Sequence, residues 1–350
     1  MQGVRKLILL ASLLAPLLAA CGTAAAPDAT SAGTGGKVTL VLGAYTTPRE
    51  AFAEVIPLFQ AHWLEQTGQT VSFEESYQGS GAQSRAVVEG FEADVVALSL
   101  EADINRIEDA GLITHDWKAV GAGGMMSNSV VAFAVRAGNP LGIRDWADLA
   151  GEGVEVLTPN PATSGGAMWN LLALYGAALR GQVEGVAGED PDAAFEFLKS
   201  VLANVVVLDN SARDSITNFE QGVGNVAITY ENEVLVGQQA GVDYELVMPS
   251  STILIENPVA VVDTYADEHG TREAAEAFLE FLFTSAAQEV FARYGLRSVD
   301  PDVAAATAGQ YPAVSDLFTI EFFGGWSQAR QEIFGETGVF NLAIQEVQGQ

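Results

Sequence analysis

The chain has 350 residues, and its 16 Lys and Arg residues against 45 Asp and Glu residues give a formal net charge of −29 at pH 7. This charge argues against nucleic acid and anionic membrane surfaces as partners. There is one cysteine, so an internal disulfide is impossible, and the three histidines, His62, His115 and His269, lack the spacing of zinc ligands. We expect no metal and no cofactor.

The first residues have the pattern of a lipoprotein signal peptide. Arg5 and Lys6 precede an uncharged apolar run at 7–20, which is shorter than the about 20 residues of a membrane-spanning helix, and Cys21 follows it. We expect residues 1–20 to be removed, which lowers the formal charge from −29 to −31 because only two basic residues are lost. Residues 21–37 are expected to be a lipidated cysteine and a flexible tether. The alternative is an ordinary signal peptide with an incidental cysteine.

Strand and helix patterns alternate after the tether. The pattern predicts strands at 38–45, 71–74, 93–98, 130–135, 154–157, 205–208 and 226–230. It predicts helices at 49–66, 82–90, 168–179, 191–202, 271–283 and 286–294. About 310 residues are more than one core usually holds, so we expect two α/β lobes. Lobe I is expected at 38–120 plus about 226–285, and lobe II at 121–225 plus part of 286–350, with a crossover near Gly121 to Gly124.

The most informative stretch is a strand-to-helix turn at 160–170, Asn-Pro-Ala-Thr-Ser-Gly-Gly-Ala-Met-Trp-Asn. Ser164 stands where an N-cap residue belongs, and Gly165 and Gly166 follow with no Cβ to keep a ligand from the backbone. The first N–H groups of a helix have no partner within the helix and lie at the positive end of its dipole. The turn is therefore a candidate anion site, and the alternative is a cap and a flexible turn alone.

Three other turns repeat this arrangement. They are Thr46-Thr47-Pro48, Gly79-Ser80-Gly81 and the segment from Asn210 to Ser215, each following a predicted strand. In an open α/β sheet, the turns at the carboxyl ends of strands gather at one crevice. We expect the four turns to enclose one anion with neutral donors, in a cleft where surface charges, which salt screens over about 8–10 Å, count for little.

Several motifs resemble those of the sulfate-binding proteins of bacterial ABC transporters. The turn at 160–170 resembles one signature of that family, and Gly79-Ser80-Gly81-x-Gln83 resembles another. Further matches are Arg136-x-Gly138-Asn139-Pro140, Asp145-Trp146-x-Asp148-Leu149, Tyr230-Glu231-Asn232-Glu233, Leu317-Phe318-Thr319-Ile320 and Phe323-Gly324-Gly325-Trp326. The resemblance runs from about Val38 to about Phe334. It implies the two-lobe periplasmic-binding fold of type II, an α/β fold with the ligand in the cleft between the lobes.

The resemblance also implies a function and a set of contacts. The protein is expected to be an extracytoplasmic receptor, anchored at Cys21, monomeric and not an enzyme, that delivers sulfate or thiosulfate to an ABC permease and its ATPase. Carried over residue by residue, the anion contacts are Thr46, Ser80, Ser164, Gly165, Gly166, Ser215 and Tyr230. Ser215 stands where the family uses an alanine N–H, and Tyr230 where it uses a tryptophan ring N–H. Thr46 or Thr47 makes the first contact. Arg213 lies beside the fourth turn and is expected to support it from behind; the alternative is that it approaches the ligand.

Two alternatives remain open. The same receptor role for another tetrahedral oxyanion, such as phosphate or molybdate, is one, and Asp214 could accept the proton of hydrogen phosphate. Otherwise its carboxylate is turned to solvent near a helix start. A hydrolase or transferase is the distant alternative, because Ser164 is not in a Gly-x-Ser-x-Gly elbow and no histidine lies near the serine turns in the sequence.

Overall fold

The computed structural model describes residues 36–349. The predicted signal peptide, Cys21 and nearly all of the predicted tether lie outside the described residues. Within them, ten strands join in one sheet. These strands are β1 (Lys37–Tyr45), β2 (Thr70–Gln78), β3 (Val95–Ala97), β4 (Met125–Arg136), β5 (Val156–Pro159), β6 (Val205–Asp209), β7 (Val226–Tyr230), β8 (Tyr244–Val247), β9 (Ser251–Val261) and β10 (Asp316–Phe318).

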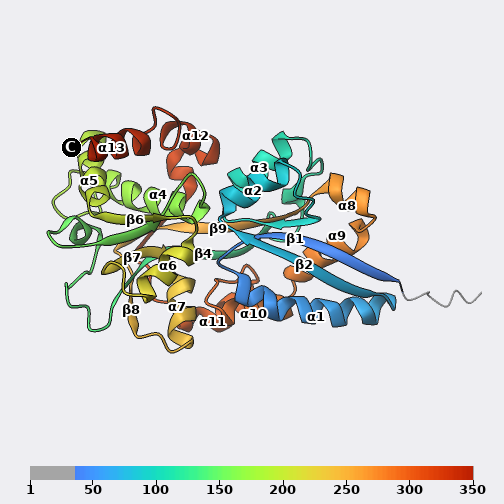
Figure 1. Ribbon diagram of the computed structural model, residues 1–350. Helices are drawn as coiled ribbons and strands as arrows, with labels where there is room; N and C mark the ends of the chain where they lie inside the picture. The colour runs from blue at the N-terminus through green and yellow to red at the C-terminus, as the bar shows by residue number, and fades with distance from the viewer. Residues whose placement is uncertain (1–35, 350) are drawn as a thin grey trace, which may run out of the picture. The chain divides into compact units, whose positions relative to one another are not determined.

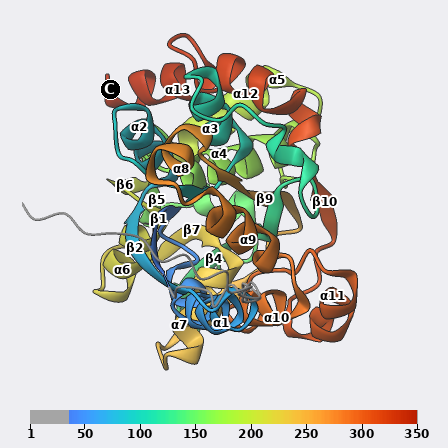
Figure 2. The same cartoon turned by 90° about the vertical axis from the view of Figure 1, so that its right-hand side faces the viewer.

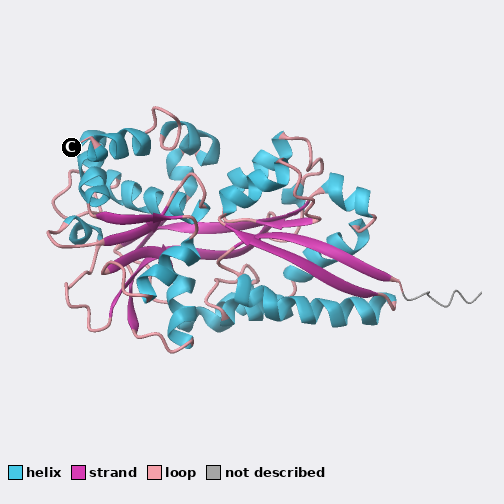
Figure 3. Cartoon of the chain, in the orientation of Figure 1, coloured by secondary structure: helices cyan, strands magenta, loops and turns pink. Residues whose placement is uncertain are grey.

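Helices cover both faces of these strands (Figure 3). They are α1 (Arg49–Thr67), α2 (Ser80–Val88), α3 (Glu101–Asp109), α4 (Gly165–Leu179), α5 (Pro191–Ala203), α6 (Ala212–Glu220), α7 (Glu231–Gln239), α8 (Asp263–His269), α9 (Arg272–Leu282), α10 (Ser285–Arg293), α11 (Pro301–Thr307), α12 (Gly325–Glu332) and α13 (Val339–Gln348). Short 3-10 turns lie at Trp117–Ala119, Trp146–Ala150, Ala308–Gln310 and Ile320–Phe323.

The sheet consists of two halves that β4 and β9 connect (Figure 1). Its strand order is β2-β1-β3-β9-β4-β7-β5-β6, with β10 beside β9 and β8 beside β4. In lobe I, β1 runs parallel to β2 and β3; in lobe II, β5 runs parallel to β6 and β7. The partner of β4 changes from β9 to β7 after Val130, and the partner of β9 changes from β4 to β3 after Pro258. Two antiparallel strands thus pass from one lobe to the other.

Each lobe has helices above and below its strands. In lobe I, α1 lies below β1 and β2, while α2 and α3 lie above them (Figure 2). The core between α1, α9 and β2 is aromatic: the ring centroid of Phe278 lies 5.0 Å from that of Phe59 and 4.8 Å from that of Phe73. Full burial of one such ring contributes about 1.5–3 kcal/mol, so this core holds the strands that lead to the helix starts.

Each predicted strand and helix overlaps an element of the structure, but several bounds differ: the strand expected at 154–157 lies at Val156–Pro159, and that expected at 93–98 spans only Val95–Ala97. We expected helices to begin at 82 and 168, but α2 begins at Ser80 and α4 at Gly165. Apolar periodicity cannot detect these first turns, because serine and glycine occupy them.

The expected lobe boundaries stay a prediction. We expected residues 226–285 in lobe I and a crossover near Gly121 to Gly124, whereas β7 pairs with β4 and β5, and the change of partner lies inside β4. Strand pairing thus favours a return to lobe I within β9.

Candidate anion-binding site

The starts of α1, α2, α4 and α6 lie at the carboxyl ends of strands. Within each lobe these strands are parallel: β1 leads to α1 and β2 to α2, while β5 leads to α4 and β6 to α6. Because the carboxyl ends of parallel strands meet at one edge of a sheet, the turns of each lobe come together. The four turns predicted from the sequence are thus grouped in two pairs, one pair from each lobe.

The turn before α2 in lobe I contacts the turn before α4 in lobe II. The N–H of Ala82 donates to the carbonyl of Thr163 over 3.1 Å. A Cβ on Gly79 would lie 2.6 Å from the carbonyl oxygens of both Thr163 and Asn210, so no side chain fits there. The two lobes are therefore closed on each other at this place.

The start of α4 has the geometry that its sequence predicts. Ser164 caps the helix, because its Oγ accepts a hydrogen bond from the N–H of Ala167. Gly165 and Gly166 form the first turn, where N–H groups have no acceptor within the helix. A Cβ on Gly165 would lie 2.6 Å from Ser99 Oγ, and one on Gly166 would lie 2.9 Å from the ring of Tyr230. The helix start therefore touches residues that follow β3 and end β7.

The hydroxyl of Ser80 already has partners. Its Oγ donates to Asp103 Oδ2 over 2.6 Å and accepts the N–H of Ser99 over 2.9 Å, and the residue is 2% exposed. Ser80 is also the first residue of α2, so its backbone N–H has no acceptor within that helix. The group of Ser80 that has no acceptor within its helix is therefore the N–H, whereas its hydroxyl is already bound.

Tyr230 lies fully buried beside the start of α4. Its Oη lies 2.6 Å from Ser99 Oγ. Burial raises the pKa of Tyr230 well above its usual value, so the phenol is protonated and remains a donor at neutral pH. Ser99 was not among the predicted site residues. It directly follows the apolar run predicted as the strand at 93–98, and that position at the carboxyl end of a strand is the signal that identifies it.

At the fourth turn, Ser215 has no free donor. Its N–H donates to the carbonyl of Ser211 over 3.2 Å, and its Oγ donates to Asp209 Oδ2 over 2.7 Å. Ser211 is the N-cap of α6, so the helix begins at Ala212 and Ser215 lies one turn further along. The role of Ser215 stays a prediction, but the N–H groups of Ala212 and Arg213 are the ones with no acceptor within the helix.

Arg213 connects the lobes at the same turn. Its guanidinium donates to Glu50 on α1 over 2.9 Å and to Glu233 on α7 over 2.8 Å. Burial alone would lower the pKa of Arg213, but the charges and hydrogen bonds of Glu233 and Glu50 raise it. The charge of Arg213 is therefore paired with two carboxylates of the chain. Such pairing fits a residue that supports the turn and does not bind the ligand.

At the first turn, Thr47 is more deeply buried than Thr46. Thr46 is partly exposed, and its carbonyl accepts the N–H of Arg49 over 3.4 Å. Thr47 is 2% exposed, and its Oγ1 has no hydrogen-bond partner among residues 36–349. Thr47, rather than Thr46, therefore holds the buried hydroxyl of this turn.

Asp214 lies on the outer side of α6. Its side chain is exposed, and it lines an open groove of about 370 Å³ together with Asp209, Asn210 and Thr217. Ser80, Ser164 and Tyr230, in contrast, are at most 3% exposed. The carboxylate of Asp214 is therefore turned to solvent and away from the enclosed helix starts.

The described histidines lie apart from the helix starts and bind carboxylates or aromatic rings. Nδ1 of His115 lies 2.8 Å from Asp263, and Nδ1 of His269 lies 2.8 Å from Asp94. In residues 36–349, no group of three or more His, Cys, Asp and Glu side chains is arranged to hold a metal ion. Over the same range, no helix combines the length and the apolar character needed to cross a bilayer.

The chain matches proteins of known family over most of its length. The family of bacterial extracellular solute-binding proteins matches residues 40–297. A sulfate-binding protein of Synechocystis sp. is 46% identical over 88% of this chain and 87% of its own length. A thiosulfate-binding protein of Pseudomonas aeruginosa is 34% identical over 96% of this chain and 98% of its own length.

A solved structure matches the fold. The sulfate-binding protein SubI of Mycobacterium tuberculosis has a TM-score of 0.76 and 41% identity, over 83% of this chain and 97% of that one. With the two halves joined by β4 and β9, this match confirms the expected two-lobe periplasmic-binding fold of type II. The chain therefore belongs to the bacterial extracellular solute-binding proteins, within the family of the sulfate-binding proteins.

Proposed function

We propose that this protein captures sulfate outside the cytoplasm and delivers it to an ABC permease and its ATPase. The relatives of Synechocystis and Mycobacterium tuberculosis are named sulfate-binding proteins, and that of Pseudomonas aeruginosa a thiosulfate-binding protein. The observation that carries the proposal is the contact between the buried starts of α2 and α4, which come from the two lobes. Thiosulfate, which has the same charge and a similar shape, is the second ligand of this site.

The donors that we assign to the anion are neutral. They come from the starts of four helices and from one ring hydroxyl: the N–H groups at Thr46 or Thr47, Ser80, Gly165, Gly166, Ala212 and Arg213, the Ser164 hydroxyl and the Tyr230 hydroxyl. Ser215 is the contact that the resemblance implies, but Ala212 and Arg213 have the better geometry for that role. Each hydrogen bond to a charged group contributes about 1.5–3 kcal/mol, so six or seven of them support micromolar or tighter binding after desolvation and association costs.

A cleft of donors selects among tetrahedral anions. Sulfate carries no proton at neutral pH, whereas hydrogen phosphate has a proton that needs an acceptor. Asp214 was the candidate acceptor, and its exposed position on the outer side of α6 removes it from the enclosed space. We therefore propose that the protein prefers sulfate and thiosulfate to phosphate.

The finer points of localisation and assembly belong to the same proposal. We propose that the mature protein begins at a lipidated Cys21, is anchored only through that lipid, acts as a monomer and catalyses no reaction. Mass spectrometry of the membrane-extracted protein should find acylated Cys21 at the N-terminus, and a free N-terminus at another residue would contradict the anchor. Light scattering of the delipidated protein should give the mass of one chain.

Calorimetric titration of the ligand-free protein tests the ligand. Sulfate, thiosulfate, phosphate and molybdate are titrated in separate experiments at one ionic strength. We expect micromolar or tighter binding of sulfate or thiosulfate and at least a hundredfold weaker binding of phosphate. Tight phosphate binding without sulfate binding would contradict the proposal.

A further inference from the structure

The polar groups of Ser99 contact residues of both lobes. Its N–H donates to Ser80 Oγ over 2.9 Å, within lobe I. Its carbonyl accepts the ring N–H of Trp169, on α4 in lobe II, over 2.9 Å. Its Oγ lies 2.6 Å from Tyr230 Oη, also in lobe II. Ser99 is 1% exposed, so these contacts are enclosed.

The Ser99 hydroxyl also lies at the start of α4. A Cβ on Gly165 would lie 2.6 Å from Ser99 Oγ and 2.8 Å from its Cβ. Gly165 is the first residue of that helix, where the backbone N–H has no acceptor within the helix. The hydroxyl of Ser99 is therefore next to the N–H groups that the proposed function assigns to the anion.

The Ser99 and Tyr230 hydroxyls each carry one proton, and only one of the two can donate to the other. The amide of Asn257 donates to the carbonyl of Ser99 over 3.1 Å and holds the backbone next to the Ser99 hydroxyl. Of the two hydroxyls, the phenol is the stronger acid, since an aliphatic alcohol does not ionise in the range where a phenol does. Tyr230 is thus the better donor within the pair, which leaves the proton of Ser99 free.

We propose that Ser99 is a ligand-binding residue whose hydroxyl donates to the bound anion, while Tyr230 donates to Ser99 and acts through it. The assignment rests on the proposed function and refines it, because Ser99 replaces Tyr230 as the hydroxyl that touches the anion. In such a chain each hydrogen bond polarises the next, so the Tyr230 hydroxyl strengthens the bond from Ser99.

The chain of hydroxyls also couples binding to closure. Ser99 belongs to lobe I, whereas Tyr230 and Gly165 belong to lobe II. The path from Tyr230 through Ser99 to the anion therefore forms only when the lobes meet. An anion that binds at the start of α4 gains this additional donor on closure, and so favours the closed form over the open one.

Three variants test the order of the donors. Sulfate affinity is measured by calorimetry for the wild type, Ser99→Ala, Tyr230→Phe and the double variant. Loss of the direct donor in Ser99→Ala should weaken binding about ten- to a hundredfold. Tyr230→Phe removes only the polarising partner and should weaken it about two- to fivefold. The double variant should match Ser99→Ala within about twofold, because Tyr230 acts through Ser99.

A matched control separates this effect from loss of a buried serine. Ser84 lies on α2, is fully buried and donates its hydroxyl to the carbonyl of Asp103 over 2.6 Å. Ser84→Ala should lower the melting temperature about as much as Ser99→Ala and leave sulfate affinity unchanged. All variants are compared by circular dichroism to establish that they are folded.

Each of the other possible results contradicts either the proposed function or the role assigned to Ser99. If the wild type binds no sulfate or thiosulfate, the proposed function fails. If the wild type binds and Ser99→Ala binds equally well, Ser99 is not a ligand-binding residue. Equal losses in the two single variants would make the hydroxyl pair only a contact between lobes, and a larger loss in Tyr230→Phe would make Tyr230 the direct donor; both results overturn this assignment.

Discussion

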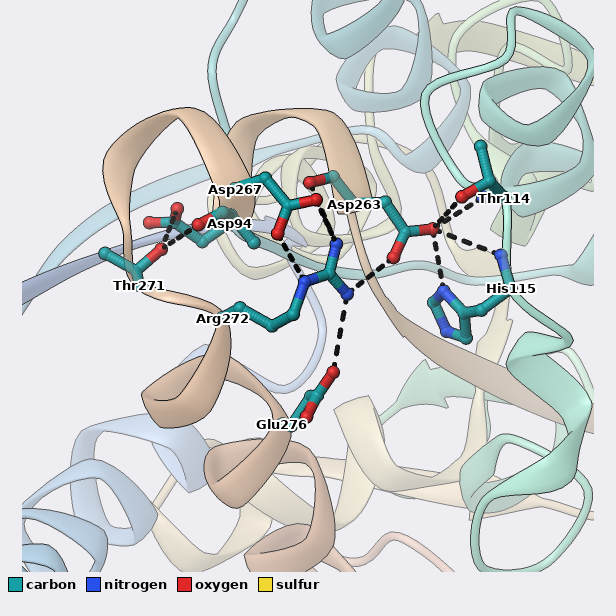
Figure 4. A network of polar contacts seen from close by, with 9 residues as sticks. Asp94, Thr114, His115, Asp263, Asp267, Thr271, Arg272 and Glu276 are labelled. Carbon is teal, nitrogen blue, oxygen red and sulfur yellow. Dashed lines mark hydrogen bonds and ion pairs between the residues drawn. The ribbon is translucent and has the colours of Figure 1, made fainter.

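Two polar regions of this protein stabilise negative charge in different ways. In the network of Figure 4, the carboxylate of Asp263 accepts hydrogen bonds from Arg272, from His115 and from the N–H and hydroxyl of Thr114. The nearby carboxylate of Asp94 accepts from Thr271 and His269. At the helix starts, by contrast, the groups that remain available are backbone N–H groups and hydroxyls. Arg213 is already bound to Glu50 and Glu233, and the guanidinium of Arg49, at the start of α1, lies 4.8 Å from the ring centroid of Tyr77.

The difference follows from how long each anion stays. Asp263 is part of the chain, so a permanent cation can offset the cost of burying it. Burial by itself would raise the pKa of Asp263, but the hydrogen bonds from His115, Thr114 and Arg272 hold it well below its usual range. A transported anion must leave again, and an unpaired cation in an empty cleft would be costly. Helix starts supply donors that remain paired with water or ligand and carry no net charge.

The largest effect is expected at the start of α4. Gly165→Asp adds a carboxylate where the anion approaches, and its Cβ would lie 2.6 Å from Ser99 Oγ. Repulsion and lost space together should weaken sulfate binding more than a thousandfold, which calorimetry measures. As the control, Gly309→Asp adds the same charge at a glycine with nothing within 4 Å of its Cβ position, and should bind normally. Wild-type affinity in Gly165→Asp would exclude this turn from the site.

Next in size is a change in the network of Figure 4 that affects stability alone. Asp263→Asn leaves Arg272 without its most buried carboxylate, since Asp263 is 8% exposed in its side chain. We expect a loss of about 2–4 kcal/mol in the free energy of unfolding and no change in sulfate affinity. Chemical denaturation and calorimetry measure the two quantities separately. A parallel loss of affinity would show that the network also serves the cleft.

The pH dependence of this loss is fixed by the sign of the pKa shift. The folded-state pKa of Asp263 is lowered, so its contribution is present above the unfolded-state value of about 3.9 and declines as the pH falls below it. The stability difference between wild type and Asp263→Asn should therefore shrink between about pH 5 and pH 2. A difference that stays constant over this range would contradict the assigned charge.

A smaller effect is expected at the ion pair between the lobes. Glu50→Gln removes the carboxylate of α1 that binds Arg213 but keeps the charge partner Glu233. The side chain of Glu50 is 35% exposed, so solvent screens much of the pair and its loss should weaken sulfate binding only about two- to fivefold. High salt should reduce even this difference. A loss above a hundredfold would mean that Arg213 needs Glu50 to hold the start of α6 in place.

The sequence predicted the local geometry of the helix starts better than the contacts between them, for a physical reason. Ser164, Gly165 and Gly166 were recognised because capping serine and close backbone approach are local properties. The partners of these residues were harder to identify, because contacts such as those of Gly165 with Ser99 and of Gly79 with Thr163 join segments far apart in the chain. The engagement of the Ser80 hydroxyl with Asp103 is likewise visible only in three dimensions.

The fourth turn shows how a local motif can leave the position of a helix start open. The segment from Asn210 to Ser215 holds two serines, and either could mark the start of the helix. Ser211 accepts the N–H of Asp214 and is the cap, so the free N–H groups lie at Ala212 and Arg213. Family resemblance pointed to Ser215, where the structure finds both donors in use.

The smallest effects are expected from changes at Asp214 and Ser215, the last two residues of the segment from Asn210 to Ser215. Ser215→Ala removes the hydrogen bond to Asp209, which should cost about 1 kcal/mol of stability and change sulfate affinity less than twofold. Asp214→Asn removes an exposed charge on the outer side of α6 and should also leave affinity and the preference for sulfate over phosphate unchanged. Competition titrations of sulfate against phosphate in both variants measure this. A tenfold loss in Ser215→Ala would place the second turn of α6 in the site, and a lost phosphate affinity in Asp214→Asn would restore Asp214 as the proton acceptor.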